Sequence, residues 1–306
     1  MNKVIVIAGP TATGKTALSV RLAKELGAEI ISADSIQIYK KLDIGSAKPS
    51  IQEREGIPHH LMDIVPADGV YSVADYVRDA KEKIDDILSR NKVPIIVGGT
   101  GLYISSLVDN VEFSDSEQDM SVRARLQEEL LKIGPEAMHQ RLKEVDPESA
   151  ESIHPNNTKR VIRALEIFET TGKTRTAYEA ESKLNKSPYD FCLIALSCER
   201  ELLYERINRR VDIMEEQGLF DEVESLLRDG ISKGAQSMQG IGYKEAVMAV
   251  EGEISAEESI ELIKKNSRNY AKRQLTWFKR GGYTWFDCLD EKLYDKVRAH
   301  IGEFGI

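Results

Sequence analysis

A short apolar run that leads directly into a glycine-rich stretch constrains the fold more than any other feature. Residues 3–8 read KVIVIA and residues 9–16 read GPTATGKT. A Val- and Ile-rich run bounded by Gly and Pro is typical of a strand buried on both faces of a parallel sheet. Leu18, Leu22 and Leu26 follow at a spacing of four, which predicts a helix that ends near Gly27. Residues 3–27 are therefore predicted to form a strand–loop–helix unit.

The glycine-rich stretch matches the pattern G-x-x-x-x-G-K-[ST] of a phosphate-binding loop. Its glycines let successive backbone N–H groups and a helix N-terminus surround phosphate oxygens. Lys15 adds a full positive charge, and the Thr16 hydroxyl is suited to ligate Mg²⁺. The residues predicted to bind phosphate groups are Gly9, Pro10, Thr11, Ala12, Thr13, Gly14, Lys15 and Thr16. The pattern alone leaves open whether the phosphates belong to ATP or to another polyphosphate.

The remaining apolar runs predict an α/β fold with an insertion. Residues 28–34, 93–99 and 190–198 read as further strands that alternate with helical stretches, which predicts a P-loop NTPase-like parallel sheet with flanking helices. Between the last two runs the sequence reads as helices only. We therefore expect a catalytic core of residues 1–114 and 189–306 and an inserted all-helical domain at 115–188.

Charge and hydropathy narrow the class of protein. The formal net charge of −9 argues against a protein that coats nucleic acid nonspecifically, because such binding needs clustered Lys and Arg. The early apolar run is far too short to span a membrane, and we expect a cytoplasmic protein with no membrane partner. The three cysteines show no C-x-x-C spacing, which indicates neither a zinc site nor a disulfide framework.

The helix expected over residues 256–280 is an exception to the acidic balance. From Lys264 to Arg280 it has seven basic residues and no acidic one. Helical geometry gathers four of them in one stripe: Lys265, Arg268, Lys272 and Lys279. An apolar and aromatic set lies roughly opposite and is expected to be buried: Ile263, Tyr270 and Trp277. A solvated charged face and a site for an anionic partner explain this pattern about equally well.

Asp34 is the strongest candidate for an acid or base. Enzymes that spend ATP usually carry a carboxylate after a later strand, but the third and fourth apolar runs supply none. Parallel strands end on one edge of a sheet, so Asp34 and Thr100 are both expected beside the phosphate loop. Asp34 is placed to orient Mg²⁺ or to accept a proton from a nucleophile. The structural alternative is a helix N-cap formed with Ser35.

Two other groups of residues suggest roles near the phosphates. Arg206 and Arg210 lie four apart on one helix face, and a planar guanidinium is suited to clamping a leaving phosphate. The alternative is a surface helix with ion pairs to Glu201 and Glu205. The pair His59–His60 has no second metal-spaced cluster nearby, so we expect a structural role for it.

Seven strings in order carry a family resemblance: GPTATGKT, ISADSIQIYKKLDIGSAKP, IPHHLMDI, VGGTGLYI, HPNNTKRVIRALEIF, QGIGYKE and AKRQLTWFKR. Over residues 4–280 the chain closely resembles the bacterial tRNA dimethylallyltransferases, also called isopentenyl-tRNA transferases. The resemblance implies transfer of a dimethylallyl group from dimethylallyl diphosphate to N6 of the adenine immediately 3′ of the anticodon. The phosphate loop would then bind the diphosphate of the prenyl donor, with Mg²⁺, rather than ATP.

The resemblance also implies roles for individual residues. Asp34 matches the general base, and Thr11 matches a residue that contacts the bridging oxygen of the scissile bond. Lys15, Thr16 with Mg²⁺, and Arg210 would stabilise the departing diphosphate, with Arg206 as the alternative arginine. These roles make Asp34, Thr11, Lys15 and Arg210 the predicted catalytic residues.

The implied partner is the anticodon stem-loop of tRNA, embraced by the helical insertion of a monomeric enzyme. The target adenine would be flipped out of its stack into a pocket. The residues implied to contact tRNA are Asp34, Ser35, Ile36, Gln37, Thr100, Arg123, Thr158, Lys159, Arg160, Val161, Ile162, Arg163, Gln239, Gly240, Ile241, Gly242, Tyr243 and Lys244.

Three alternatives share parts of this pattern. An ATP-dependent nucleoside or nucleotide kinase shares the loop, the sheet and the arginine-bearing helix. A prenyltransferase that modifies free adenine nucleotides shares the donor site but needs neither the basic helix nor the insertion. A noncatalytic RNA-binding nucleotide switch shares the loop, although no guanine-reading N-K-x-D string is present.

Overall fold

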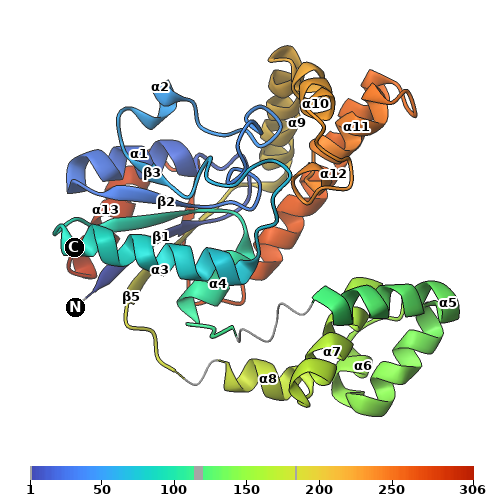
Figure 1. Ribbon diagram of the computed structural model, residues 1–306. Helices are drawn as coiled ribbons and strands as arrows, with labels where there is room; N and C mark the ends of the chain where they lie inside the picture. Colours follow the sequence, from blue (N-terminus) through green and yellow to red (C-terminus); the bar gives the residue numbers. More distant parts are fainter. Residues whose placement is uncertain (1, 114–119, 183–184) are drawn as a thin grey trace. The chain divides into compact units, whose positions relative to one another are not determined.

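The computed structural model describes residues 2–113, 120–182 and 185–306 (Figure 1). The chain divides into two compact units, Met1–Val108 with Pro188–Ile306, and Asp109–Ser187. The insertion boundary predicted between residues 114 and 115 lies outside the described residues. The boundary predicted between residues 188 and 189 falls next to Pro188, where the first unit resumes. Each unit is described below by itself.

The first unit contains a six-stranded sheet in which all paired strands run parallel, in the order β3-β2-β4-β1-β5-β6 (Figure 1). The strands are β1 Lys3–Ala8, β2 Glu29–Ala33, β3 His59–His60, β4 Pro94–Gly98, β5 Asp190–Ser197 and β6 Thr284–Asp287. The predicted α/β class and parallel sheet are confirmed, and the four long apolar runs are β1, β2, β4 and β5. The two edge strands were not predicted, because two and four residues are too few to produce an apolar pattern.

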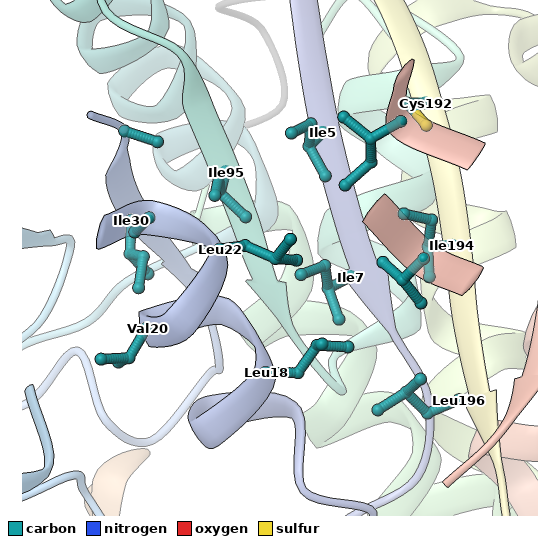
Figure 2. Close-up of a cluster of buried hydrophobic side chains, with 14 residues drawn as sticks. Ile5, Ile7, Leu18, Val20, Leu22, Ile30, Ile95, Cys192, Ile194 and Leu196 are labelled. Carbon is teal, nitrogen blue, oxygen red and sulfur yellow. The ribbon is translucent and has the colours of Figure 1, made fainter. Parts of the chain in front are cut away.

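Helices cover both faces of this sheet. The helices of the first unit are α1 Lys15–Leu26, α2 Ile51–Arg54, α3 Val73–Ser89, α4 Gly101–Val108, α9 Arg200–Glu216, α10 Leu219–Arg228, the short 3₁₀ helix η2 Ser237–Gln239, α11 Tyr243–Val250, α12 Ala256–Phe278 and α13 Leu293–Glu303. On one face, Leu18 and Leu22 of α1 pack with Ile5, Ile7 and Ile194 (Figure 2). The alternate residues of β1 are also fully buried, and α3 packs against β2 and β4. Burial on both faces explains why the strands read as continuous apolar runs.

The strand order places the loops that matter at one edge of the sheet. β1 lies between β4 and β5, and β4 lies between β1 and β2. In open parallel sheets, ligands bind beyond the carboxyl ends of the strands. The segments that follow β1, β2 and β4 therefore converge there, and they carry the phosphate loop, Asp34 and Thr100.

The second unit is helical in its described part, with α5 Met120–Val145, α6 Pro147–Ser152, α7 Thr158–Thr171 and α8 Arg175–Glu181. α5 is broken at Gly134, which has φ 81°, and Pro135 follows. The two helices predicted on either side of this Gly-Pro pair are confirmed. Leu126, Met138 and Leu165 belong to the buried core that joins α5 to α7.

α12 begins where the sequence predicted, after a capping box formed by Ser255 and Glu258. Its aromatic face was predicted only in part. Phe278 is fully buried, whereas Trp277, which was expected to be buried, is 41% exposed and lies over Gly101. The heptad spacing missed this because the straight helix rotates by about 20° per seven residues. In the described part of the chain, no helix is both long and apolar enough to cross a membrane.

Candidate functional site

The phosphate loop joins β1 to α1 and is closed by its own side chains. Gly9 has φ 134°, and a Cβ there would collide with the backbone of β5. Gly14 caps α1 in the left-handed conformation, with φ 80°. The Thr13 hydroxyl and the Lys15 ammonium both donate to the carbonyl of Pro10, at 2.9 and 2.6 Å. The loop therefore curls in front of a helix N-terminus, which is the arrangement that binds phosphate.

This loop bounds a cavity of about 630 Å³ whose lining residues all belong to the first unit. The other walls come from the segment after β2, from α9, from α12 and from residues 236–244. The predicted site residues that line it are Thr11, Ala12, Thr13, Gly14, Lys15, Thr16, Asp34, Ser35, Ile36, Gln37, Arg210, Gln239, Gly240, Ile241 and Lys244. Residues from four distant parts of the chain thus share one cavity.

Asp34 combines a structural role with a free oxygen. Its Oδ1 accepts hydrogen bonds from the backbone N–H groups of Ile36 and Gln37, at 2.9 and 3.2 Å. No helix begins here, so the N-cap alternative is wrong: Asp34 instead closes a turn of its own segment, and the Thr100 hydroxyl supports this turn by accepting from the N–H of Ser35 at 3.1 Å. Its Oδ2 has no hydrogen-bond partner among the described residues. The carboxylate is therefore oriented by its own turn and keeps one oxygen for a ligand.

Arg210 reaches the phosphate loop, whereas Arg206 does not line the cavity. Arg210 donates to the Thr11 hydroxyl at 2.8 Å and to the carbonyl of Ala47 at 3.2 Å. Arg206 donates instead to the Cys288 sulfur at 3.4 Å. Burial lowers the pKa of Arg210 below its ordinary value, but a guanidinium remains charged in a protein. Geometry therefore favours Arg210 as the arginine that meets the phosphates.

Lys15 and Arg210 both line the cavity, and the second positive charge affects the pKa of Lys15. Burial, together with the positive charge of Arg210, lowers the pKa of Lys15 to about 7, although Asp34 opposes the shift. A bound anion would reverse the effect, because it favours the charged ammonium. The positive charges of Lys15 and Arg210 in the cavity are therefore expected to be balanced when a polyanion binds.

The α12 wall was not predicted as part of the site. Gln274 is buried; its amide nitrogen donates to the carbonyl of Gly99 at 2.9 Å, and its oxygen accepts from the N–H of Thr11 at 3.1 Å. Tyr270 and Arg273 line the cavity beside it, and burial raises the pKa of Tyr270 to about 12. A polar residue on the buried side of an amphipathic helix was the available signal for Gln274.

Only part of the basic stripe is exposed to solvent. Lys265, Lys272 and Lys279 are exposed, but Arg268 is half-buried and donates to the side chain of Asn208. A phosphate-contacting role for the stripe stays a prediction for its three lysines.

The segment 239–244 needs one correction. Gln239, Gly240, Ile241 and Lys244 line the cavity. Tyr243 was predicted to contact tRNA, but its side chain is 0% exposed and its hydroxyl is bonded to Glu222 at 2.7 Å. Gly242 precedes it with φ 100°. A side-chain contact between Tyr243 and a nucleic acid is therefore excluded by burial.

The remaining predicted tRNA-contacting residues belong to the second unit. Lys159 and Arg160 are exposed at the N-terminal turn of α7, which begins at Thr158. Val161 and Ile162 were predicted with them, but they are 1% and 6% exposed in the helical core. Helical rotation points these two inward, so their contact with RNA is corrected to a packing role.

Arg123 and Arg163 both pair with Glu166, which is itself 2% exposed. The Arg123 guanidinium lies 2.8 Å from the Glu166 carboxylate, and that of Arg163 lies 3.1 Å from it. Two arginines around one carboxylate leave a net positive charge, which is compatible with a phosphate contact. The role of Arg123 beside the target base stays a prediction.

The donor set fits a magnesium ion that binds together with phosphates. Thr16 and Asp34 both line the cavity, and hydroxyl and carboxylate oxygens are ligands that Mg²⁺ accepts alongside water and phosphate. Within residues 2–113, 120–182 and 185–306, no cluster of three His, Cys, Asp or Glu side chains could hold a metal. His60 instead lies 2.8 Å from the buried Glu29, in agreement with a structural role.

Comparison with known protein families gives one match that covers most of the chain. The model of a family described as IPP transferase matches residues 37–281. A tRNA dimethylallyltransferase from Acetivibrio thermocellus is 48% identical over 100% of this chain and 99% of its own length. A tRNA dimethylallyltransferase from Bacillus cereus is 50% identical over 98% of this chain and 94% of its own length.

Solved structures agree with these matches. The tRNA isopentenylpyrophosphate transferase of Staphylococcus epidermidis is 45% identical, with a TM-score of 0.72, over 99% of each chain. A eukaryotic dimethylallyltransferase acting on tRNA is 33% identical, with a TM-score of 0.81, over 97% of this chain and 77% of its own. The sequence and the fold therefore point to the same relatives.

Proposed function

The chain belongs to the IPP transferase family and is a transferase that attaches dimethylallyl groups to tRNA, and we propose that its donor is dimethylallyl diphosphate and its acceptor N6 of the adenine immediately 3′ of the anticodon. One observation carries the proposal. A carboxylate with a free oxygen, Asp34, shares a cavity with a phosphate loop and a loop-bound arginine, Arg210. A proton acceptor and a site for a leaving diphosphate are what this transfer requires.

Asp34 serves as the general base in the proposed reaction. An adenine amino group is a weak nucleophile because its lone pair is delocalised into the ring. As N6 bonds to C1 of the prenyl group, the C1–O bond to diphosphate breaks and one N6 proton passes to Asp34 Oδ2. The two N–H groups held by Oδ1 keep the carboxylate oriented throughout.

The phosphate loop and Arg210 stabilise the charge that gathers on the leaving diphosphate. Backbone N–H groups of the loop, the Lys15 ammonium and the Arg210 guanidinium would stabilise this charge as preorganised donors. Thr11, which accepts a hydrogen bond from Arg210, would contact the bridging oxygen. Mg²⁺, held by Thr16, would neutralise part of the diphosphate charge when bound.

The acceptor is proposed to be a flipped base of the tRNA anticodon loop. Unstacked bases in single-stranded loops are read on their edges, and flipping costs about a few kcal/mol. Ile36, Gln37 and Lys244 border the cavity and would surround such a base. Exposed Lys159 and Arg160 of the helical unit would contact backbone phosphates. We propose that the enzyme acts as a monomer in the cytoplasm.

The test is mass-spectrometric analysis of nucleosides in tRNA from cells that lack the protein. We expect N6-prenyladenosine to disappear and to return when the wild-type chain is supplied, but not when Asp34→Asn is supplied. Unchanged N6-prenyladenosine in cells without the protein would overturn the proposal. The kinase alternative is not favoured, because the matching relatives are transferases of prenyl groups.

A further inference from the structure

The segment from residue 34 to residue 50 joins β2 to α2 with almost no regular structure. Its only strand-like pairing within the described residues is an isolated bridge between Tyr39 and Val65. Ala47, near its end, has φ 45°, which a side-chain-bearing residue adopts only when its surroundings enforce it. Hydrogen bonds within the segment, from the N–H of Ala47 to the carbonyl of Ile44 and from the N–H of Lys48 to that of Asp43, form its turns, and contacts with other elements hold these turns in place.

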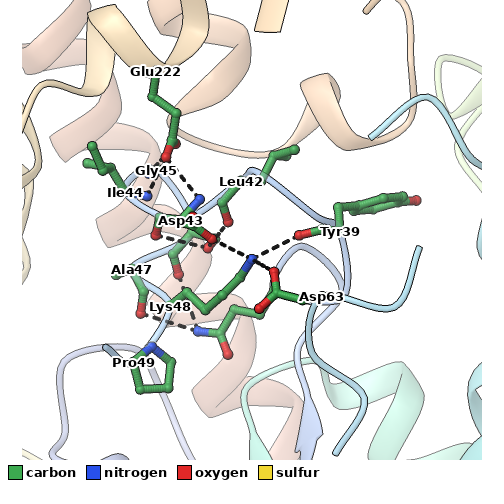
Figure 3. A network of polar contacts seen from close by, with 12 residues as sticks. Tyr39, Leu42, Asp43, Ile44, Gly45, Ala47, Lys48, Pro49, Asp63 and Glu222 are labelled. Carbon is green, nitrogen blue, oxygen red and sulfur yellow. Dashed lines mark hydrogen bonds and ion pairs between the residues drawn. The ribbon is translucent and has the colours of Figure 1, made fainter. Parts of the chain in front are cut away.

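Glu222 of α10 provides the first of these contacts. Its Oε2 accepts from the N–H groups of Asp43 and Ile44, at 3.0 and 2.8 Å, and its Oε1 accepts from the N–H of Gly45 at 3.1 Å (Figure 3). Three successive backbone N–H groups thus converge on one carboxylate. Such a backbone nest ordinarily binds an anion, and here it takes a side chain of the same unit.

Tyr243 extends this contact by one residue. Its hydroxyl donates to Oε1 of Glu222 at 2.7 Å and accepts from the N–H of Ser46 at 3.2 Å. A Cβ on Gly45 would lie 2.6 Å from the tyrosine ring, so the segment packs directly on it. Burial and the charge of Glu222 raise the pKa of Tyr243 well above its usual range, which keeps its proton available for donation.

Lys48 fixes the segment from its other end. Its side chain is 3% exposed, and its ammonium donates to the carbonyl of Tyr39 at 2.9 Å and to Oδ1 of Asp43 at 2.7 Å. It also pairs with Asp63 (Figure 3). These hydrogen-bond and ion-pair partners offset the cost of burying the Lys48 ammonium. Residues 43–48 are thus held on both sides.

Ala47 lies inside this braced stretch and faces the cavity. Its carbonyl accepts from one nitrogen of Arg210 at 3.2 Å, while the other nitrogen of Arg210 donates to Thr11 at 2.8 Å. We propose that Glu222 and Tyr243 are positioning residues: by fixing residues 43–46 they hold the Ala47 carbonyl where it aims Arg210 at the diphosphate. The inference rests on the proposed function only for the identity of the reaction.

Two hydrogen bonds, donated from two different nitrogens, fix the orientation of a guanidinium, whereas a single hydrogen bond does not. Losing the Ala47 contact would leave Arg210 attached to Thr11 alone and free to rotate. Displacements of about 1 Å at a reacting group cost about 10²-fold in rate. A substitution of Glu222 should therefore weaken diphosphate binding only when Arg210 is present. A substitution that acts through general folding should weaken binding whether or not Arg210 is present.

The test is a double-mutant cycle of Glu222→Gln with Arg210→Ala, measured by calorimetry as the Kd for inorganic diphosphate. Glutamine has the size of glutamate but only one acceptor oxygen, so it cannot accept all three N–H groups. We expect Glu222→Gln to weaken binding about tenfold in the wild-type background and less than about twofold beside Arg210→Ala. Tyr243→Phe should act in the same direction by about threefold.

Glu224→Gln is the matched control, because Glu224 lies on the same helix and pairs with Arg228 at the surface. It should leave diphosphate binding unchanged. In the transfer assay, Glu222→Gln and Tyr243→Phe should lower kcat and leave the KM for tRNA unchanged. Equal losses with and without Arg210, or no loss from either variant, would overturn the positioning role. Diphosphate binding coupled to Arg210 without any prenyl transfer would contradict the proposed function but support the positioning role.

Discussion

The two loops that meet at the cavity acquire their shapes in different ways. The phosphate loop is closed by bonds from Thr13 and Lys15 to Pro10, three and five residues away. The segment 34–50 is braced by Glu222 and Tyr243, which lie 177 to 197 residues from the groups they hold. The closure of the first loop is therefore encoded by its own residues, although Thr11 also bonds to the distant Gln274 and Arg210. The second depends on the folding of α10 and α11 around it.

The largest effect should come from the residue that begins the second loop. Asparagine at position 34 keeps an Oδ1 acceptor for Ile36 and Gln37 but cannot take a proton. We expect Asp34→Asn to lower the single-turnover transfer rate by about 10²–10⁴, with the KM for tRNA little changed. Asp68→Asn, an exposed site on a nearby loop, is the control and should change the rate less than about twofold. A fully active Asp34→Asn enzyme would reduce Asp34 to its role in closing the turn at Ile36 and Gln37.

The next effect tests the phosphate loop. Lys15→Met should lower kcat/KM for the donor by about 10²–10³, the size of losing one preorganised donor to a developing charge. The pKa of Lys15 is depressed, so its buried ammonium destabilises the ligand-free fold at neutral pH. The variant should therefore have a higher Tm without ligand. Lys24→Met, at an exposed site on the same helix, should show neither change.

The difference between the loops explains what the sequence could predict. The strand, loop and helix of residues 3–27 follow from local patterns, so the fold class and the phosphate site were predictable. The hydrogen bonds of Gln274 and Glu222 to the loops were not predictable, because no local pattern around Thr11 or Gly45 indicates which distant residue will contact them. The predictions for Trp277 and Tyr243 were wrong because their exposure could not be read from the sequence. An aromatic residue in a motif fits a packing role and a binding role equally well.

The pH dependence of binding sharpens the account of the phosphate loop. A bound diphosphate favours the charged ammonium, so the pKa of Lys15 rises above its ligand-free value of about 7 in the complex. Affinity for dimethylallyl diphosphate should therefore fall above pH 7, toward about tenfold per pH unit. Calorimetric titration between pH 6 and 9 measures this, and Lys15→Met should remove the slope. A slope retained in Lys15→Met would assign the titration to another group.

The smallest effect tests the second loop through stability. A Cβ at residue 45 would lie 2.6 Å from the Tyr243 ring, so Gly45→Ala must displace the segment. Overpacking of this kind costs about 1–3 kcal/mol in free energy of unfolding. Urea denaturation measures it against Gly234→Ala, where an added Cβ meets only ordinary contacts. Equal stabilities of the two variants would show that Tyr243 does not brace the segment.

The most direct measurement uses dimethylallyl diphosphate labelled with ³H in the prenyl group and with ³²P in both phosphates. Purified protein is incubated with this donor and unmodified tRNA, with Mg²⁺ and without ATP. We predict that ³H enters the tRNA as N6-dimethylallyladenosine while an equal amount of ³²P is released as diphosphate. Incorporation of ³²P into RNA, or an absolute requirement for ATP, would contradict the claim that the phosphate loop holds a leaving diphosphate.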